Sequence, residues 1–288
     1  MIALQRMPAF IAAGATLLFI IALLHQHHDN IPVAKSLFKR YVTPSINYPS
    51  PHHQLILPFS TKNLPSFFEI ATKHGTDKVS THSYQDMYEK YFPPLRHQPL
   101  KMLEIGLGCN MNYGPGASYY TWLEYFPHVD LYYIEYDAAC AATWANKTTG
   151  VTIFTGDQAD VVFLNKFIEE AGRDFDIIID DGGHTMHQQK TSLKELYKIV
   201  KPGGLYFCED LQTSYEGAYG GGDVAKAKGE LTMVQFIAQM IEDLSVPPRR
   251  QDFEHADQVS HIDCSREVCV FEKKKTRIKV VMANVDGQ

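Results

Sequence analysis

Two acidic pairs in the sequence stand where chemistry could be done. In the motif FDIIIDDGGH an apolar run ends on Asp180 and Asp181 and is followed by His184. The next apolar run ends on a second pair, Glu209 and Asp210. Apolar runs that close on carboxylates are typical of buried parallel strands, whose ends form the ligand-binding edge of an α/β sheet. Two such strand ends predict a site where carboxylates converge on a hard cation with a histidine beside it.

The elements around these pairs alternate strictly between strand and helix. This alternation predicts a doubly wound α/β fold with a parallel sheet. After it we expect a helix over 231–244 and two final strands, near His261 and at VCVFEKK, which form an antiparallel hairpin at one edge. The alternating strands are expected to begin at 100 and to cover 130–135, 151–157, 175–180 and 205–208, with helices over 119–126, 161–171 and 185–200.

A glycine-containing turn, LEIGLG, follows the first strand and indicates a ribose-bearing cofactor. Gly106 and Gly108 admit a ligand close to the backbone, and Glu135 at the end of the second strand can accept from ribose hydroxyls. A nicotinamide dinucleotide needs a third glycine where Met111 stands, and Glu104 would repel its phosphates. S-adenosylmethionine carries a sulfonium and no phosphate, so the site favours it. An NAD-type oxidoreductase on the same fold is kept as the alternative.

Taken in order, LEIGLG, IEYD, GDQAD, FDIIIDDGGH and KPGGLYFCEDLQTSY resemble a class I S-adenosylmethionine-dependent methyltransferase. The upstream HGTDK and HSYQDMYEKYFPPLR and the GPGAS loop are similar to those of the mycinamicin-type macrolide sugar O-methyltransferases, a metal-dependent branch of that fold. The resemblance covers about residues 64–273. It implies a Rossmann-like, doubly wound sheet of seven strands, the last of them antiparallel.

The resemblance also implies roles for individual residues. It makes His184 the general base that deprotonates a hydroxyl of a small molecule or sugar. The family position at Gly183 is commonly serine, which is a departure. S-adenosylmethionine contacts are implied at Glu104, Gly106, Glu135, Asp157 and Gln158, with Thr76, Asp77 and Ser118 as additions, and Mg²⁺ ligands at Asp181, Glu209 and Asp210.

Some of the residues around this site also have purely structural interpretations. Asp180 is interpreted as a helix N-cap or a structural acceptor outside the metal set, and His184 alone could be a turn histidine. Three carboxylates crowded at one sheet edge without a cation would repel one another, which favours the metal reading. Tyr215 and Tyr219 belong to a glycine-rich stretch that is either a lid or acceptor wall or a plain surface loop. A catalytically silent, membrane-tethered binding protein is the third hypothesis.

The N-terminal residues carry a compartment signal. Residues 8–24 are uncharged and mostly apolar, so 1–28 are expected to be an uncleaved signal anchor and single transmembrane segment of the endomembrane system. A cleaved signal and a secreted protein are the alternative. Residues 29–63 are proline-rich and read as a stalk or linker, 64–275 as the methyltransferase domain, and 276–288 as a tail without assigned role.

Composition narrows the partners further. A formal net charge of −6 and a pI near 6.1 give no electrostatic reason to expect nucleic acid, so a small-molecule or sugar acceptor is expected. A homo-oligomer is left open. Cys264 and Cys269, two of five cysteines, are predicted either to pair in a lumenal compartment or to be buried free thiols.

Overall fold

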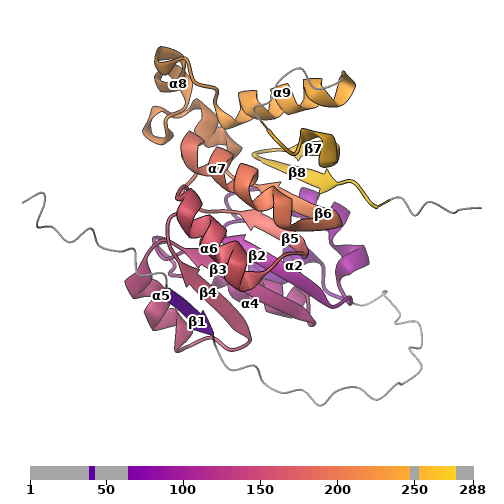
Figure 1. Ribbon diagram of the computed structural model, residues 1–288. Helices are drawn as coiled ribbons and strands as arrows, with labels where there is room; N and C mark the ends of the chain where they lie inside the picture. Colours follow the sequence, from indigo (N-terminus) through magenta and orange to yellow (C-terminus); the bar gives the residue numbers. More distant parts are fainter. Residues whose placement is uncertain (1–38, 43–63, 247–252, 277–288) are drawn as a thin grey trace, which may run out of the picture. The chain divides into compact units, whose positions relative to one another are not determined.

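The computed structural model describes residues 39–42, 64–246 and 253–276 (Figure 1). The predicted anchor and the C-terminal residues 277–288 lie outside the described residues, as does most of the predicted stalk. Among the helices that the structure describes, none combines the length and apolarity needed to cross a bilayer.

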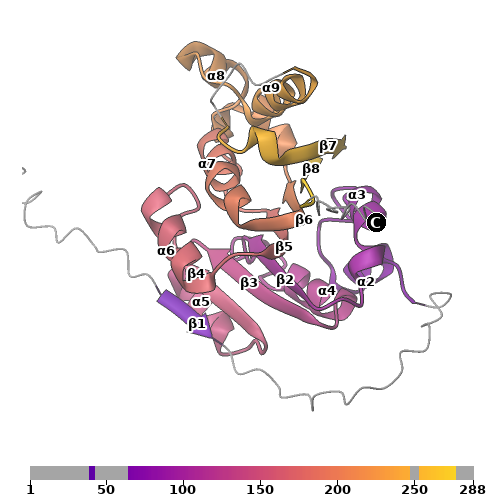
Figure 2. The same ribbon diagram turned by 45° about the vertical axis from the view of Figure 1, so that its right-hand side comes forward.

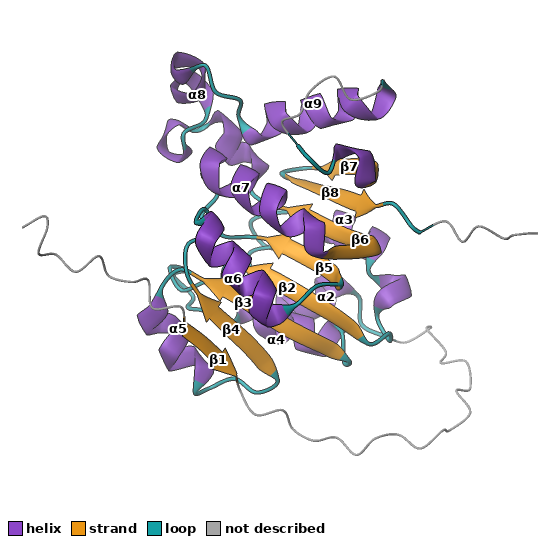
Figure 3. Cartoon of the chain, viewed as in Figure 1, coloured by secondary structure: helices purple, strands orange, loops and turns teal. Residues whose placement is uncertain are grey.

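The described strands form one eight-stranded sheet in the order β1-β4-β3-β2-β5-β6-β8-β7 (Figure 3). Strands β2 to β6 pair in parallel, whereas β8 runs antiparallel to both β6 and β7. This confirms the parallel α/β fold, the final hairpin and the antiparallel last strand. The strands are β1 Lys39–Val42, β2 Leu100–Ile105, β3 Val129–Glu135, β4 Val151–Thr155, β5 Phe175–Asp180, β6 Val200–Cys208, β7 Val259–Ser265 and β8 Val268–Lys273.

One strand corrects the sequence-based expectation. The resemblance implies seven strands, but β1 adds an eighth by pairing antiparallel with β4 at the sheet edge. β1 lies inside the segment predicted to be a stalk, in a proline-free stretch between Pro32 and Pro44. An edge strand leaves a row of backbone donors and acceptors unpaired, so any nearby extended segment without proline can pair with it.

Helices cover both faces of the sheet (Figure 2). Helices α2, α3 and α4 lie on one face of the sheet, and α6 and α7 lie on the other. The face that the connecting helices cover therefore changes between the neighbouring strands β2 and β5. This change opens a crevice at the carboxyl ends of the strands. The helices are α2 Phe67–His74, α3 Gln85–Tyr91, α4 Ala117–Tyr125, α5 Ala138–Ala145, α6 Val161–Ala171, α7 Met186–Leu196, α8 Gly222–Lys228 and α9 Met233–Ser245.

The helix ends near the crevice are fixed by their sequences. The side chain of Thr185 caps α7 by accepting from the backbone N–H of Gln188, and the side chain of Gln188 accepts from the backbone N–H of Thr185. The helix therefore begins at Met186, two residues after His184. The N-cap is therefore Thr185 and not Asp180. The predicted helix over 185–200 ends earlier, at Leu196, and continues as a 3₁₀ turn.

Helix α5 was not among the expected elements. Its N-cap, Asp137, accepts from the backbone of Ala139 and Cys140. The helix follows directly after the strand that carries Glu135, so it lies next to the carboxyl end of that strand.

A cluster of aromatic side chains fills the space between α2, α3, α4 and the sheet. Trp122 stacks on Phe67 with ring centroids 5.5 Å apart, and both rings are buried. Burying such large apolar surfaces is the main force that holds a layer of helices on a sheet. Tyr88 belongs to this cluster, and its hydroxyl donates to Glu209, which directly follows β6. The cluster therefore lies directly beneath the carboxyl ends of β2 and β6.

Candidate active site

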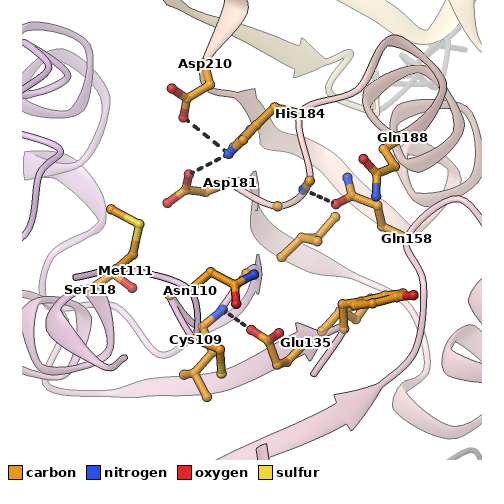
Figure 4. A pocket seen from close by; sticks show the side chains of 18 of the residues that line it. Cys109, Asn110, Met111, Ser118, Glu135, Gln158, Asp181, His184, Gln188 and Asp210 are labelled. Atoms are coloured by element: carbon orange, nitrogen blue, oxygen red, sulfur yellow. Dashed lines mark hydrogen bonds and ion pairs between the residues drawn. The ribbon is translucent and has the colours of Figure 1, made fainter. Parts of the chain in front are cut away.

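A cavity of about 570 Å³ opens at the carboxyl ends of the parallel strands (Figure 4). It has the size and location expected of a small-molecule site in an open α/β sheet. Glu104 and Glu209 are the two predicted site residues that do not line it. The ten that do are Thr76, Asp77, Gly106, Ser118, Glu135, Asp157, Gln158, Asp181, His184 and Asp210.

Gly106 joins the glycine loop to the acidic residues. Its backbone has φ +97°, in the left-handed region, and a Cβ at this position would lie 2.0 Å from the carbonyl oxygen of Asp181. A side chain is therefore excluded by both conformation and space. The glycine lets the end of β2 approach the end of β5 closely.

Glu135 is fixed by the backbone around it. One carboxylate oxygen accepts from the N–H of Leu107 at 2.9 Å, and the other accepts from the N–H of Asp137 at 2.8 Å. Burial raises the pKa of this carboxyl, although the backbone donors oppose the rise. Each oxygen retains a further lone pair, so the side chain can accept hydroxyl donors from a ribose in the cavity.

Gln158 bridges two strand ends. Its amide nitrogen donates to Asp180 at 2.8 Å. Its amide oxygen accepts from the N–H of Gly183 at 2.7 Å (Figure 4). Asp180 is fully buried and also accepts from the hydroxyls of Ser192 and Tyr206. Asp180 is thus the structural acceptor that was one of the two sequence-based alternatives.

Glu104 is placed differently from the expectation. It is fully buried and does not line the cavity, because Ser118 stands between its carboxylate and the cavity. One of its oxygens accepts from Ser118 at 2.7 Å, from the indole of Trp122 at 2.8 Å and from the hydroxyl of Tyr133. Glu104 therefore borders the cavity only through Ser118, and its contact with a cofactor stays a prediction.

Asp181, His184 and Asp210 converge at the other end of the cavity. The Nε2 atom of His184 lies 3.9 Å from Asp181 and 3.7 Å from Asp210 (Figure 4). His184 and Asp210 both adopt left-handed backbone conformations, with φ of 57° and 55°. Such conformations cost about 1–3 kcal/mol in non-glycine residues and concentrate at functional sites.

Glu209 does not join this group. Its side chain is fully buried, and one oxygen lies 2.5 Å from the ammonium of Lys78 while the other accepts from the hydroxyl of Tyr88. Of the three carboxylates expected to converge, Asp181 and Asp210 do so, whereas the Glu209 carboxylate is paired with Lys78 and Tyr88.

Lys78 was missed by the sequence analysis. Its side chain is 1% exposed, and its ammonium also lies 2.6 Å from Asp181. Burial alone would lower the pKa of Lys78, but Asp181, Glu209 and Glu104 raise it well above its ordinary value. Burial raises the pKa of Asp181 to about 6, against the lowering effect of Lys78. The only signal for this lysine in the sequence was its position in the HGTDK motif.

Two disulfides are present. Cys109 in the glycine loop is bonded to Cys140 in α5, and Cys264 is bonded to Cys269 across the β7–β8 hairpin. The second pairing was one of the two alternatives, and the first was not expected. Cys208 is free and buried, and burial raises the pKa of its thiol well above the ordinary value. Disulfides are typical of proteins in oxidising compartments.

Tyr219 forms part of the wall near His184, with ring centroids 6.4 Å apart. Tyr215, from the same stretch, is 73% exposed and does not line the cavity. The glycine-rich stretch therefore contributes Tyr219 to the cavity wall, whereas Tyr215 lies on the surface.

The donor atoms at this end of the cavity fit a divalent cation. In the described part of the chain, Asp181, His184 and Asp210 are the group of three potential ligands whose donor atoms lie within 4.8 Å of one another. Carboxylate oxygens suit Mg²⁺ and Mn²⁺. Among the described residues, the buried Nδ1 atom of His184 finds no hydrogen-bond partner.

Comparison with solved structures defines the class of the fold. The chain matches the methyltransferase MycE of the mycinamycin pathway, solved with Mg, S-adenosylhomocysteine and mycinamycin VI, with a TM-score of 0.63 and 26% identity over 73% of this chain and 55% of that one. The described domain therefore has the class I S-adenosylmethionine-dependent methyltransferase fold. No family model matches the sequence.

Curated relatives narrow the resemblance to sugar O-methyltransferases. A tetracenomycin-C rhamnosyl 3'-O-methyltransferase of Streptomyces olivaceus is 35% identical over 61% of this chain and 44% of its own length. Mycinamicin VI 2''-O-methyltransferase of Micromonospora griseorubida is 33% identical over 54% of this chain and 39% of its own length. The chain spans about half the length of the curated relatives it matches. The predicted resemblance to macrolide sugar O-methyltransferases is confirmed.

Proposed function

We propose that the protein is an S-adenosylmethionine- and Mg²⁺-dependent O-methyltransferase that acts on a hydroxyl group of a sugar-bearing small molecule. The observation that carries this proposal is one cavity lined by both halves of such a site. The glycine loop and Glu135 lie at one end, and Asp181, His184 and Asp210 lie at the other. The relatives named as sugar O-methyltransferases support the same reaction.

The cofactor's adenosine would lie against the ends of β2, β3 and β4. Glu135 accepts from the ribose hydroxyls, and Asp157 and Gln158 line the same wall. Ser118 and Thr76 offer hydroxyls to the methionine end of the cofactor. Methyl transfer from a sulfonium is an in-line displacement, so these contacts act mainly by aligning the methyl group with the acceptor oxygen.

The acidic end of the cavity prepares the acceptor. Asp181 and Asp210 would hold Mg²⁺, which supplies Lewis acidity that lowers the pKa of a nearby hydroxyl. The Nε2 atom of His184 faces the gap between these two carboxylates and takes the hydroxyl proton. General base catalysis of this kind typically contributes about 10²- to 10⁴-fold. Tyr219 beside His184 gives the acceptor an aromatic wall.

A transfer assay tests the proposal. The chain is incubated with S-adenosylmethionine labelled in its methyl group and a panel of glycosides that carry adjacent free hydroxyls. Label is expected in at least one glycoside, with loss of transfer in EDTA and recovery with added Mg²⁺. Full activity in EDTA would remove the metal from the mechanism. Cofactor binding without any transfer would favour a silent binding protein, and binding of NAD in its place would favour the oxidoreductase.

We also infer that residues 1–28 anchor the protein in a membrane of the secretory route, with the domain on the oxidising side. The uncharged apolar segment at 8–24 and the two disulfides support this location. Alkaline carbonate extraction of cell membranes, followed by protease treatment of sealed vesicles, tests it. The protein is expected in the membrane pellet and protected from protease. Release into the medium would indicate a cleaved signal.

A further inference from the structure

The Cys109–Cys140 disulfide joins two elements that shape the end of the cavity where the cofactor would bind. Cys109 belongs to the glycine loop and lines the cavity, and Cys140 belongs to the first turn of α5. Both residues are partly exposed, and the cavity gives a small thiol in solution a route to Cys109. Exposed disulfides are typically the labile or regulatory ones. The bond is therefore open to thiol–disulfide exchange.

The disulfide closes a ring of contacts around Glu135. The backbone N–H of Leu107 donates to one oxygen of Glu135, and the N–H of Asp137 donates to the other. The carboxylate of Asp137 in turn accepts from the N–H of Cys140 at 3.0 Å. The disulfide leads from Cys140 back to Cys109, which follows Leu107 closely in the chain. Breaking the bond therefore opens this ring beside the carboxylate that would accept from the ribose.

The loop between Cys109 and Gly116 would gain conformational freedom when the bond opens. Gly114 and Gly116 have left-handed backbone conformations, with φ of 83° and 97°. Ordering glycine costs more entropy than ordering other residues. At Gly116 the loop packs on α5, because a Cβ there would lie 2.6 Å from the ring of Trp144. The disulfide and this contact thus hold the two ends of the loop on the same helix.

The position of Cys140 favours opening of the bond by a dithiol reductant. A thiolate of the dithiol attacks the Sγ atom of Cys109 and forms a mixed disulfide, and the electron pair of the broken bond leaves with the Sγ atom of Cys140. A helix N-terminus stabilises a thiolate, and Cys140 is the third residue of α5. The second thiol of the dithiol then releases Cys109. The dithiol is oxidised to a disulfide, and its two protons pass to the two protein thiols.

We propose that the Cys109–Cys140 disulfide is a redox-sensitive strap, which a dithiol reductant opens and whose opening weakens the binding of S-adenosylmethionine. The inference rests on the proposed function only in requiring that an S-adenosyl ligand binds beside the glycine loop. The coupling is reciprocal, because a ligand that binds the oxidised form more tightly also makes that form harder to reduce. A difference of about fivefold in affinity corresponds to about 20 mV, since a tenfold change is about 30 mV for a two-electron couple.

Redox titration of the full 288-residue chain tests this proposal, with dithiothreitol as the dithiol and S-adenosylhomocysteine as the ligand. The double variant Cys264→Ser with Cys269→Ser is used, so that Cys109–Cys140 is the pair that is titrated. Alkylation followed by mass spectrometry measures the reduced fraction, and calorimetry measures the dissociation constant of each form. Reduction is expected to weaken ligand binding about fivefold. Saturating ligand is expected to make the midpoint potential about 20 mV more negative.

The converse variant, Cys109→Ser with Cys140→Ser, keeps the hairpin disulfide and is the matched control. Cys264 and Cys269 join β7 to β8, and neither residue lines the cavity. Opening this disulfide is expected to leave the dissociation constant for S-adenosylhomocysteine unchanged, and saturating ligand is expected to leave its midpoint potential unchanged. A shift of equal size in the control would show a general effect of the ligand on stability, and it would overturn the proposal.

Two other results would also contradict the strap. One is an equal dissociation constant for the oxidised and reduced forms, and the other is resistance of the Cys109–Cys140 bond to excess dithiothreitol in the folded chain. If a serine variant fails to fold, isotope-coded alkylation and peptide mapping of the wild-type chain give the reduced fraction of each pair. A ligand-dependent shift is then expected for Cys109–Cys140 and none for Cys264–Cys269. Failure of the oxidised wild-type chain to bind S-adenosylhomocysteine would overturn the proposed function, and this inference with it.

Discussion

The cofactor half of the cavity, formed by the glycine loop, Glu135 and Asp157, is shaped mainly by backbone. Gly106 excludes any side chain, the Cys109–Cys140 disulfide ties the loop to α5, and backbone N–H groups hold Glu135. The acidic half, formed by Asp181, His184 and Asp210, is shaped by charge. Lys78 holds Asp181, and side-chain contacts hold Asp210. Alignment in the first half and proton transfer in the second half should therefore fail separately.

The largest expected effect breaks the acidic half alone. His184→Ala removes the proposed base, so kcat should fall at least about a hundredfold while the dissociation constant for S-adenosylhomocysteine stays unchanged. Steady-state kinetics and calorimetric titration measure the two quantities. His187→Ala is the control, because His187 is an exposed residue three positions along the same segment. A parallel loss of Mn²⁺ affinity in His184→Ala would make His184 a ligand of the ion.

Gly106→Ala should break the cofactor half. The added Cβ would collide with the backbone of Asp181, and misplacement by about 1 Å can cost a factor of about a hundred in rate. We expect at least tenfold weaker binding of S-adenosylhomocysteine, measured by calorimetry. Gly150→Ala shares the left-handed conformation, with φ +71°, but its Cβ meets nothing within 4 Å and the residue does not line the cavity. Equal losses in the two variants would assign the effect to backbone conformation alone.

A smaller effect is expected from the disulfide in the cofactor half. The double change Cys109→Ser and Cys140→Ser frees the loop, which must then be ordered when the cofactor binds. The loss should be about fivefold in affinity for S-adenosylhomocysteine, or ~1 kcal/mol, with kcat at saturating cofactor nearly unchanged. Cys264→Ser with Cys269→Ser removes the hairpin disulfide and is the matched control. An equal loss in the control would show a general effect on stability.

The smallest effect concerns thiol chemistry. Cys208 is buried and its thiol has a raised pKa, whereas the other four cysteines are paired. Since the thiolate is the reactive form, native protein at about pH 8 should show no reaction with an aromatic disulfide reagent. Denatured but unreduced protein should release one equivalent of the reagent's thiol. Five equivalents would show that neither disulfide forms.

The sequence predicted the parallel sheet, the final hairpin and the convergence of Asp181, His184 and Asp210, because apolar runs and their acidic ends are local patterns. It also placed Glu209 in this group, whereas the structure turns that side chain towards Lys78 and Tyr88. It did not predict Lys78, which lies 103 positions before Asp181 and reaches it only through the packing of α2 and α3 on the sheet. The Cys109–Cys140 pairing depends in the same way on where α5 packs. Strand β1 was missed because pairing at a sheet edge leaves little trace in a short segment.

His184 and Asp210 have a consequence for how this domain can change over generations. Both hold a left-handed backbone that glycine would adopt without strain. A selection for thermal stability alone would favour replacement at both positions, because relief of about 1–3 kcal/mol of strain exceeds the roughly 0.4–1 kcal/mol that glycine costs through the unfolded chain. Each replacement would remove a side chain that faces the same gap. Persistence of histidine and aspartate in sister sequences would therefore indicate that the chemistry is under selection, and glycine at both would mark a descendant that has kept the fold and lost the reaction.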